Sequence, residues 1–214
     1  MAKPVRPEPK YFISNTTGNY QHYLDTVFGN RPMAGFLGEK STSYYEMPIV
    51  AKRIKNCIPK AKFIFIMRNP VQRALSNYRF SKQNGFESRS LNEVFIQELD
   101  VPKNGNISTS VDPFDYLGRG EYMKHIKSYT DLFGMDSLLP IVFEDLIGNN
   151  ELEPIWEFLK LPSIQNHFGK SFRNESRIEE VDNEIIAKLV AHFQQKNNEL
   201  ADFIGLDLRL WETK

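Results

Sequence analysis

The stretch Lys62-Phe63-Ile64-Phe65-Ile66-Met67-Arg68-Asn69-Pro70-Val71-Gln72-Arg73-Ala74-Leu75-Ser76-Asn77-Tyr78 decides the fold. The apolar run 63–67 is too short for a helix and too continuous for a half-exposed strand, so it predicts a buried strand of a parallel sheet. Asn69 is a typical N-cap and Pro70 a typical first helical residue, which predicts that a helix begins at once. The sequence therefore predicts an α/β fold with a parallel sheet.

Basic and hydroxyl side chains follow this strand closely. Arg68 stands at its carboxyl end, where open α/β sheets bind their ligands, and Arg73 and Ser76 follow within the predicted helix. An arginine fork, a hydroxyl and the amides of a helix start form an anion site, most naturally for a phosphate. The alternative is an ordinary strand–helix junction, in which Arg68 pairs with a surface carboxylate.

The whole segment resembles the 3′-phosphate-binding motif of the sulfotransferases that use 3′-phosphoadenosine 5′-phosphosulfate (PAPS). In that family an apolar strand leads into Arg-Asp/Asn-Pro, followed by Arg and by Ser-x-Tyr. The matching residues are Arg68-Asn69-Pro70, Arg73 and Ser76-Asn77-Tyr78. The resemblance implies a three-layer P-loop-like fold with a central parallel sheet flanked by helices. It also implies that Arg68 and Ser76 hold the 3′-phosphate and that Arg73 belongs to the same cofactor site.

Two further stretches resemble catalytic segments of this family. Glu8 lies between two prolines and precedes Tyr11-Phe12, as in the Glu-x-x-aromatic-Phe stretch of carbohydrate-type members, whose glutamate is the general base. Gly38 to Tyr45 resembles Gly/Val-Glu-Lys-Ser/Thr-Pro-x-Tyr, which implies that Lys40 reaches the sulfuryl group; Thr42 replaces the proline. Without the resemblance, Glu8 is expected in a solvated terminal arm and Lys40 is an ordinary exposed lysine.

The second half of the chain adds weaker parallels. Arg173 and Arg177 lie in a polar loop, and in the family a basic loop at this point closes over the nucleotide, so both are candidate cofactor contacts. An apolar strand over 138–143 followed by Glu144-Asp145-Leu146, and a tail ending in Trp211, also match the family order.

Periodicity and caps predict the remaining elements. Helices are expected over 19–28, from Pro48 to Pro59, from Ser90, from Tyr116 to Gly134, over 151–161, over 184–193 and over 200–204, and a short strand is expected over 36–42.

Composition restricts the function classes. The 214 residues fit one domain, 1–214, and 27 basic against 27 acidic side chains disfavour a nucleic-acid protein with a broad basic face. The four histidines lack metal-ligand spacing, and Cys57 is expected in a helix core. No stretch has the length of a membrane span and no apolar signal core is present, so a cytoplasmic location is expected.

One family segment is missing from the sequence. Sulfotransferases open with a strand and a Lys-x-Gly-Thr-Thr/Ser loop that holds the 5′-phosphosulfate, and no such strand–loop–helix precedes Glu8. Three explanations are open: the chain is a fragment, it is a degenerate relative, or another chain completes the site. The first is favoured because Glu8, Lys40, Arg68 and Ser76 occur together, and because losing a central strand exposes sheet edges.

The sequence thus predicts a sulfotransferase that uses PAPS, releases adenosine 3′,5′-bisphosphate (PAP) and needs no metal. Its acceptor is expected to be a hydroxyl or amine, most simply on a glycan, and the oligomeric state is left open. The first alternative is a non-catalytic or degenerate protein that binds PAP. The second is a P-loop nucleotide kinase, against which the absence of Gly-x-x-x-x-Gly-Lys-Ser/Thr argues.

Overall fold

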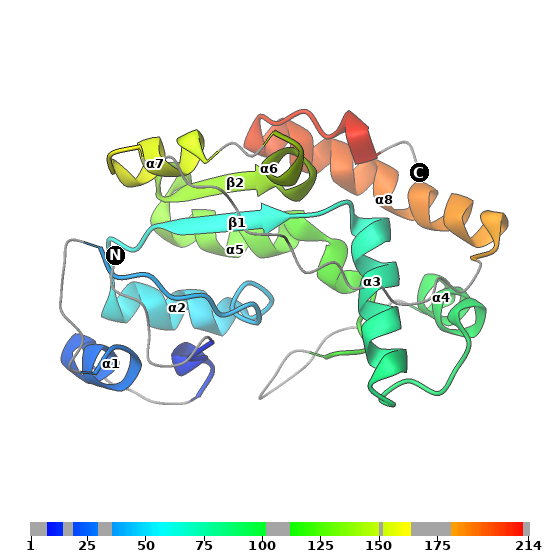
Figure 1. Ribbon diagram of the computed structural model, residues 1–214, viewed down its shortest axis with the longest axis horizontal. Coiled ribbons are helices and arrows are strands. Elements are labelled where there is room, and N and C mark those ends of the chain that lie inside the picture. Colours follow the sequence, from blue (N-terminus) through cyan, green and yellow to red (C-terminus); the bar gives the residue numbers. More distant parts are fainter. Residues whose placement is uncertain are drawn as a thin grey trace. The chain divides into compact units, whose positions relative to one another are not determined.

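The computed structural model describes residues 8–14, 19–29, 36–101, 112–149, 152–163 and 181–211 (Figure 1). Its contacts divide the chain into two compact units. Unit 1 comprises Met1–Lys62, Asn106–Val111 and His125–Leu138; unit 2 comprises Phe63–Gly105, Asp112–Lys124 and Leu139–Lys214. The expectation of a single domain stays a prediction.

Unit 1 is built from short helices. The 3-10 helix η1 (Tyr11–Ile13) and the helices α1 (Tyr20–Val27) and α2 (Pro48–Cys57) lie in it, together with most of α5 (Tyr122–Phe133) and with η3 (Met135–Ser137). Pro48 opens α2, as the sequence predicts. The Asn19 side chain caps α1 by accepting from the His22 amide. Gly134, with φ of 80°, follows the end of α5.

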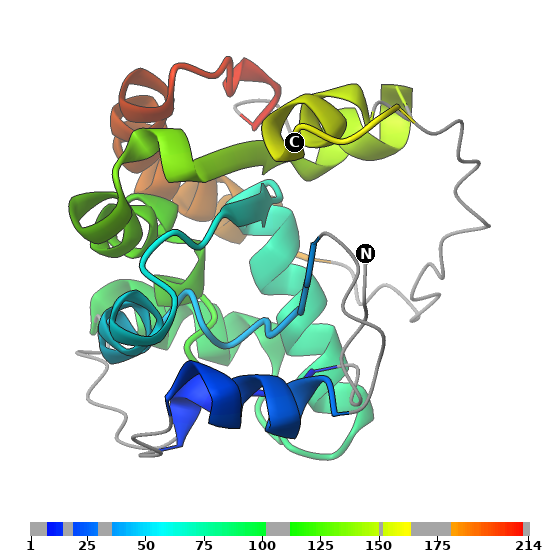
Figure 2. The same cartoon turned by 90° about the vertical axis from the view of Figure 1, so that its left-hand side faces the viewer.

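An aromatic cluster forms much of the core of unit 1. Tyr11 and Phe12 of η1 are buried and contact Tyr23 of α1, with ring centroids 5.3 and 5.1 Å apart. The elements η1 and α1, dark blue in Figures 1 and 2, accordingly lie side by side. The chain that follows Glu8 is therefore anchored in the core, and the expectation of a solvated arm is wrong for residues 8–14.

Unit 2 contains a two-stranded sheet formed by β1 (Phe63–Met67) and β2 (Leu138–Val142). Both arrows point the same way in Figure 1, so the strands are parallel, as the sequence predicts. The helix α3 (Pro70–Gln83) leaves the carboxyl end of β1. Asn69 caps it by accepting from the amides of Val71 and Gln72 at 3.0 and 3.1 Å.

The core of unit 2 lies where α3, α4 (Leu91–Asp100) and α8 (Asn183–Ile204) pack together. Ser90 and Glu93 form a capping box at the start of α4. The buried core residues are Val71, Ala74, Leu75, Tyr78, Leu91, Val94, Phe95, Tyr116, Leu117, Ile185, Leu189 and Phe193. The remaining elements of this unit are η2 (Gly118–Gly120), α6 (Phe143–Asn149), α7 (Glu153–Leu159) and η4 (Arg209–Trp211).

Four expectations need correction. The helix expected from Tyr116 begins at Tyr122, after the 3-10 helix η2. The strand expected over 36–42 is reduced to a single bridge residue, Leu37. The two helices expected over 184–193 and 200–204 are one continuous helix, α8. The strand β1 forms as predicted, but Ile64 and Ile66 are 37% and 54% exposed, because nothing in the described part of the chain covers that face.

Candidate functional site

The side chains of Glu8 and Lys40 meet in unit 1. The Lys40 Nζ lies 3.2 Å from the Glu8 Oε1, although 31 residues separate the two in sequence. The Thr42 hydroxyl donates to the same carboxylate, at 3.1 Å from Oε2 and 3.3 Å from Oε1. The Glu8 side chain is 27% exposed and the Lys40 side chain 74% exposed, so the pair stands at the surface.

Two main-chain contacts hold the Glu8 segment against the Lys40 segment. The Lys10 amide donates to the Ser41 Oγ and the Phe12 amide donates to the Tyr44 Oη, each at 3.1 Å. Lys10 adopts φ of 53°, in the left-handed region, and η1 begins at the next residue. This turn buries the rings of Tyr11 and Phe12 while Glu8 stays at the surface.

Arg53 of α2 fastens the other end of η1. Its Nη1 donates to the carbonyl oxygens of Phe12, Ile13 and Ser14 at 2.9, 2.7 and 3.1 Å. These carbonyls end a short helix and have no intrahelical donor, so a guanidinium satisfies them together.

The carboxylate of Glu8 is kept ionised. Partial burial alone would raise its pKa, but the hydrogen bonds from Lys40 and Thr42 and the charge of Lys40 outweigh that effect. The pKa of Glu8 therefore lies below its ordinary value. A surface carboxylate in this state can accept a proton from a group that approaches it.

Glu39, next to Lys40, has the opposite environment. Burial raises its pKa to about 6, although hydrogen bonds from Tyr44 and Tyr23 oppose the rise. Its Oε2 is buried and has no hydrogen-bond partner in the described part of the chain. Burial also raises the pKa of Tyr23 and of Tyr44. The pKa values of the two carboxyl groups are thus shifted in opposite directions.

The predicted phosphate site lies in unit 2, where β1 passes into α3. The Tyr122 hydroxyl binds the main chain of Arg68 twice: it donates to the carbonyl at 2.9 Å and accepts from the amide at 3.3 Å. One Glu144 oxygen accepts from the Asn69 amide at 2.9 Å, and the other accepts from the Trp211 Nε1 at 3.2 Å. The side-chain amide of Asn69 donates to the Trp211 carbonyl at 3.3 Å. The junction is therefore fixed by residues from three other parts of unit 2.

Two side chains that are predicted to donate to a phosphate, those of Arg68 and Ser76, take no part in the bonds that fix this main chain. The Arg68 guanidinium lies 5.8 Å from the centroid of the Phe143 ring, and it makes no hydrogen bond or ion pair within the described residues. The Ser76 hydroxyl likewise makes no hydrogen bond to another described residue. A guanidinium at the end of a parallel strand and a hydroxyl in the helix that follows can each donate to a phosphate group.

The other residues predicted to bind the cofactor are Arg73, Arg173 and Arg177. The Arg73 guanidinium donates to the Tyr116 carbonyl and lies 3.5 Å from the Asn77 Oδ1, which also accepts from Arg119 at 2.6 Å. Arg73 thus fastens main chain, and its role in cofactor binding stays a prediction. Arg173 and Arg177 lie outside the described residues.

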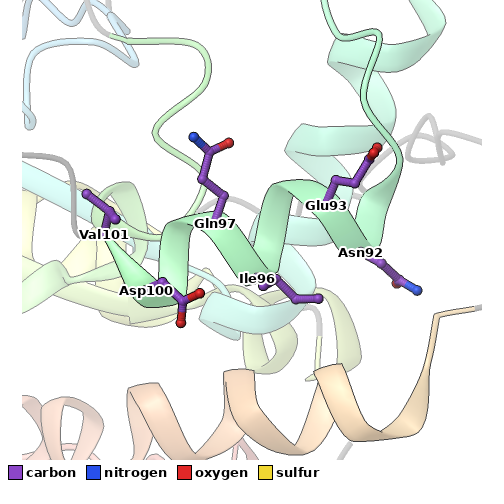
Figure 3. A pocket seen from close by; sticks show the side chains of 6 residues that line it. All are labelled: Asn92, Glu93, Ile96, Gln97, Asp100 and Val101. Carbon is purple, nitrogen blue, oxygen red and sulfur yellow. The ribbon is translucent and has the colours of Figure 1, made fainter.

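A groove also lies along α4 (Figure 3). Its lining side chains all come from this helix and the residue after it, and none of the predicted site residues is among them. The lining residues are Asn92, Glu93, Ile96, Gln97, Asp100 and Val101.

The described residues contain neither a metal-binding group nor a membrane-spanning helix. No group of histidine, cysteine, aspartate and glutamate side chains there could hold a metal ion. No helix in the same part of the chain is long and apolar enough to cross a membrane.

Sequence reasoning did not assign the residues that support these sites, namely Tyr44, Arg53, Tyr122 and Trp211. A usable signal existed for Glu144. It lies two residues after the end of the second parallel strand, and the carboxyl ends of neighbouring parallel strands meet at one edge of the sheet.

Comparison with known proteins gives consistent results. The family model described as "Sulfotransferase domain" matches residues 46–200, a range that includes Arg68 and Ser76 but not Glu8 or Lys40. The human bifunctional heparan sulfate N-deacetylase/N-sulfotransferase 2 is 27% identical over 134 residues, which are 62% of this chain and 15% of that protein. The mouse heparan sulfate glucosamine 3-O-sulfotransferase 6 is 27% identical over 170 residues, 71% of this chain and 46% of that protein.

The chain thus spans about a seventh of the first relative and just under half of the second. Among solved structures, the crystal structure of a sulfotransferase from Alicyclobacillus acidocaldarius has a TM-score of 0.75 at 22% identity. It covers 97% of this chain and 87% of that one, which confirms the predicted α/β fold.

Proposed function

The chain belongs to the sulfotransferase domain family, and we propose that it transfers a sulfuryl group from PAPS to a hydroxyl or amine of a carbohydrate. The contact between Glu8 and Lys40 carries this proposal. An ionised carboxylate and a primary amine, far apart in sequence, lie 3.2 Å apart at the surface of unit 1. These are the two groups that the transfer needs, a base for the acceptor and a cation for the departing charge.

The reaction is an in-line displacement at sulfur. The acceptor oxygen or nitrogen forms a bond to sulfur while the bond from sulfur to the bridging phosphate oxygen breaks. PAP leaves with that electron pair, and Glu8 takes the proton of the acceptor. Lys40 offsets the charge that grows on the departing oxygen.

Arg68 and Ser76 hold the 3′-phosphate of the nucleotide in this proposal. Their donors are available in the described structure, while the main chain of Arg68 is fixed by Tyr122. Their task is to position the donor, since the 3′-phosphate takes no part in bond breaking.

The carbohydrate acceptor is supported by the relatives that are named for heparan sulfate. Their names include both N- and O-sulfotransfer, so the proposal covers amines and hydroxyls.

A transfer assay tests the proposal. The protein is incubated with PAPS labelled with radioactive sulfur and with a heparan sulfate oligosaccharide that carries free amines and hydroxyls. We expect label in the oligosaccharide and stoichiometric release of PAP, and we expect both to persist with a magnesium chelator, unlike in a P-loop kinase. PAP binding without any transfer to this or other glycan acceptors would instead support the non-catalytic alternative.

A further inference from the structure

Four cross-links join the segment 8–12 to the segment 39–44. Two of them join main-chain amides to the side chains of Ser41 and Tyr44, and so set the spacing of the segments. The other two, from Lys40 and Thr42, end on the carboxylate of Glu8. Among the described residues only these last two bond to the carboxylate, and the charge of Lys10 also favours its ionised form.

Lys40 and Thr42 differ in how firmly they hold it. The lysine has a long side chain, 74% exposed, and in the proposed function its amine serves the departing oxygen. The threonine side chain is β-branched and has one stiff torsion, so its hydroxyl occupies few positions. Thr42 is therefore the partner that can stay on Glu8 while Lys40 turns to the sulfuryl donor.

The hydroxyl is also placed so that it leaves the base usable. It lies at nearly equal distances, 3.1 and 3.3 Å, from the two carboxylate oxygens. An ionised carboxylate has about four acceptor positions, so one donor leaves room for the acceptor's proton. The sequence pattern of the family has proline here, which has no hydroxyl, so this donor is a feature of the present chain.

We propose that Thr42 is a positioning residue for the general base: its hydroxyl holds the Glu8 carboxylate in place and keeps it ionised when Lys40 engages the donor. The inference rests on the proposed function and assigns one further residue to it. It predicts that loss of the hydroxyl makes the ionised form of Glu8 less stable and so raises the pKa of this carboxyl group.

The test compares Thr42→Val, which keeps the shape and removes the donor, with Thr42→Ser, which keeps the donor. In Thr42→Val the acidic limb of the pH profile of kcat/KM is expected to move to higher pH. At pH values below the midpoint of this limb, kcat/KM should fall by roughly two- to tenfold relative to the wild type. The KM for PAPS should not change. Thr42→Ser, which keeps the hydroxyl but loses the β-branch, should show a smaller shift than Thr42→Val. Thr130→Val should retain the wild-type profile, because its lost hydroxyl binds only its own helix through the Lys127 carbonyl.

A second readout does not depend on activity. The Glu8 carboxyl carbon is labelled with carbon-13, identified by its loss in Glu8→Gln, and titrated by NMR. Its pKa should be higher in Thr42→Val than in the wild type, and closer to the wild-type value in Thr42→Ser. An unmoved titration in Thr42→Val overturns the inference. Absence of sulfate transfer by the wild type contradicts the proposed function instead, and the titration still decides the role of Thr42.

Discussion

At the scale of single residues, Glu8 receives donors of two kinds on one carboxylate, an amine from Lys40 and a hydroxyl from Thr42. If it is the general base, removing its charge must stop proton transfer. Glu8→Gln should lower kcat by roughly 10²–10⁴-fold and leave PAP affinity unchanged. Steady-state transfer assays and calorimetric titration with PAP measure the two quantities. A variant that transfers sulfate at the wild-type rate would show that Glu8 is not the base.

Glu39 allows a prediction on stability. Its pKa, raised from 4.5 unfolded to about 6 folded, means that the folded state binds the proton more tightly. The stability it contributes is therefore full below pH 4.5 and is lost as the pH rises through 6. Glu39→Gln should stabilise the protein by up to about 2 kcal/mol at pH 8 and by little at pH 4. Urea unfolding at both pH values measures this. The exposed control Glu157→Gln should be near neutral at both; equal effects of Glu39→Gln at the two pH values would refute the linkage.

The sequence indicated Glu8 and Lys40 only through motifs. Each motif is local, and neither one states that the two side chains meet. The contacts of Thr42 and Arg53 could not be predicted, because they join residues 34 and about 40 positions apart through a fold that the local pattern does not encode. The chemical role of Glu8 and Lys40 stays a prediction.

At the scale of elements, the junction between β1 and α3 depends on the hydroxyl of Tyr122. Tyr122→Phe removes both bonds to the Arg68 main chain and leaves a carbonyl without its donor. We expect a loss of about 1–2 kcal/mol in stability and a rise of roughly two- to tenfold in the Kd for PAP. Tyr129→Phe is the matched control, because it also removes a hydroxyl that donates to a carbonyl, that of Tyr44 at 2.8 Å. It should cost similar stability without changing PAP affinity. Equal PAP affinity in both variants would remove Tyr122 from the site.

The two faces of β1 should tolerate substitution differently. Met67 is 1% exposed and Ile66 is 54% exposed. Met67→Ala should cost about 2–5 kcal/mol, because it leaves a cavity in the core. Ile66→Thr should stay within about 0.5 kcal/mol, since it changes a surface side chain that keeps its β-branch. Chemical unfolding of both variants measures the difference. A large cost for Ile66→Thr would mean that this face is covered in the protein.

Strong local signals predicted the elements well. The cap at Asn69, the proline openings of α2 and α3 and the cap at Ser90 are all present. The break expected within α8 is absent for a reason that lies outside the local pattern. Lys196, in the polar run 194–199, forms an ion pair with Glu121 at 2.9 Å. Asn197 of the same run is buried, as are Phe193 and Leu200 on either side of it in the sequence. Tertiary contacts thus carry the helix through a run that looks like a loop.

At the scale of the whole molecule, the order of motifs was sufficient to identify the family. The strand, the Arg68 junction and the later strand recur in the same sequence order, and the family match and the fold agree with that order. The acceptor could not be derived in this way. Acceptor choice is made by side chains of surface loops, which follow no periodic pattern that a sequence could reveal.

The most direct test of the central claim is a calorimetric comparison of PAP with AMP, which lacks the 3′-phosphate. A guanidinium and a hydroxyl that bind this phosphate should favour PAP by roughly 10- to 100-fold. Arg68→Met should abolish most of that preference, and Ser76→Ala should reduce it, without a comparable change in AMP affinity. Equal binding of PAP and AMP by the wild type, or a full preference retained in Arg68→Met, would contradict the assignment.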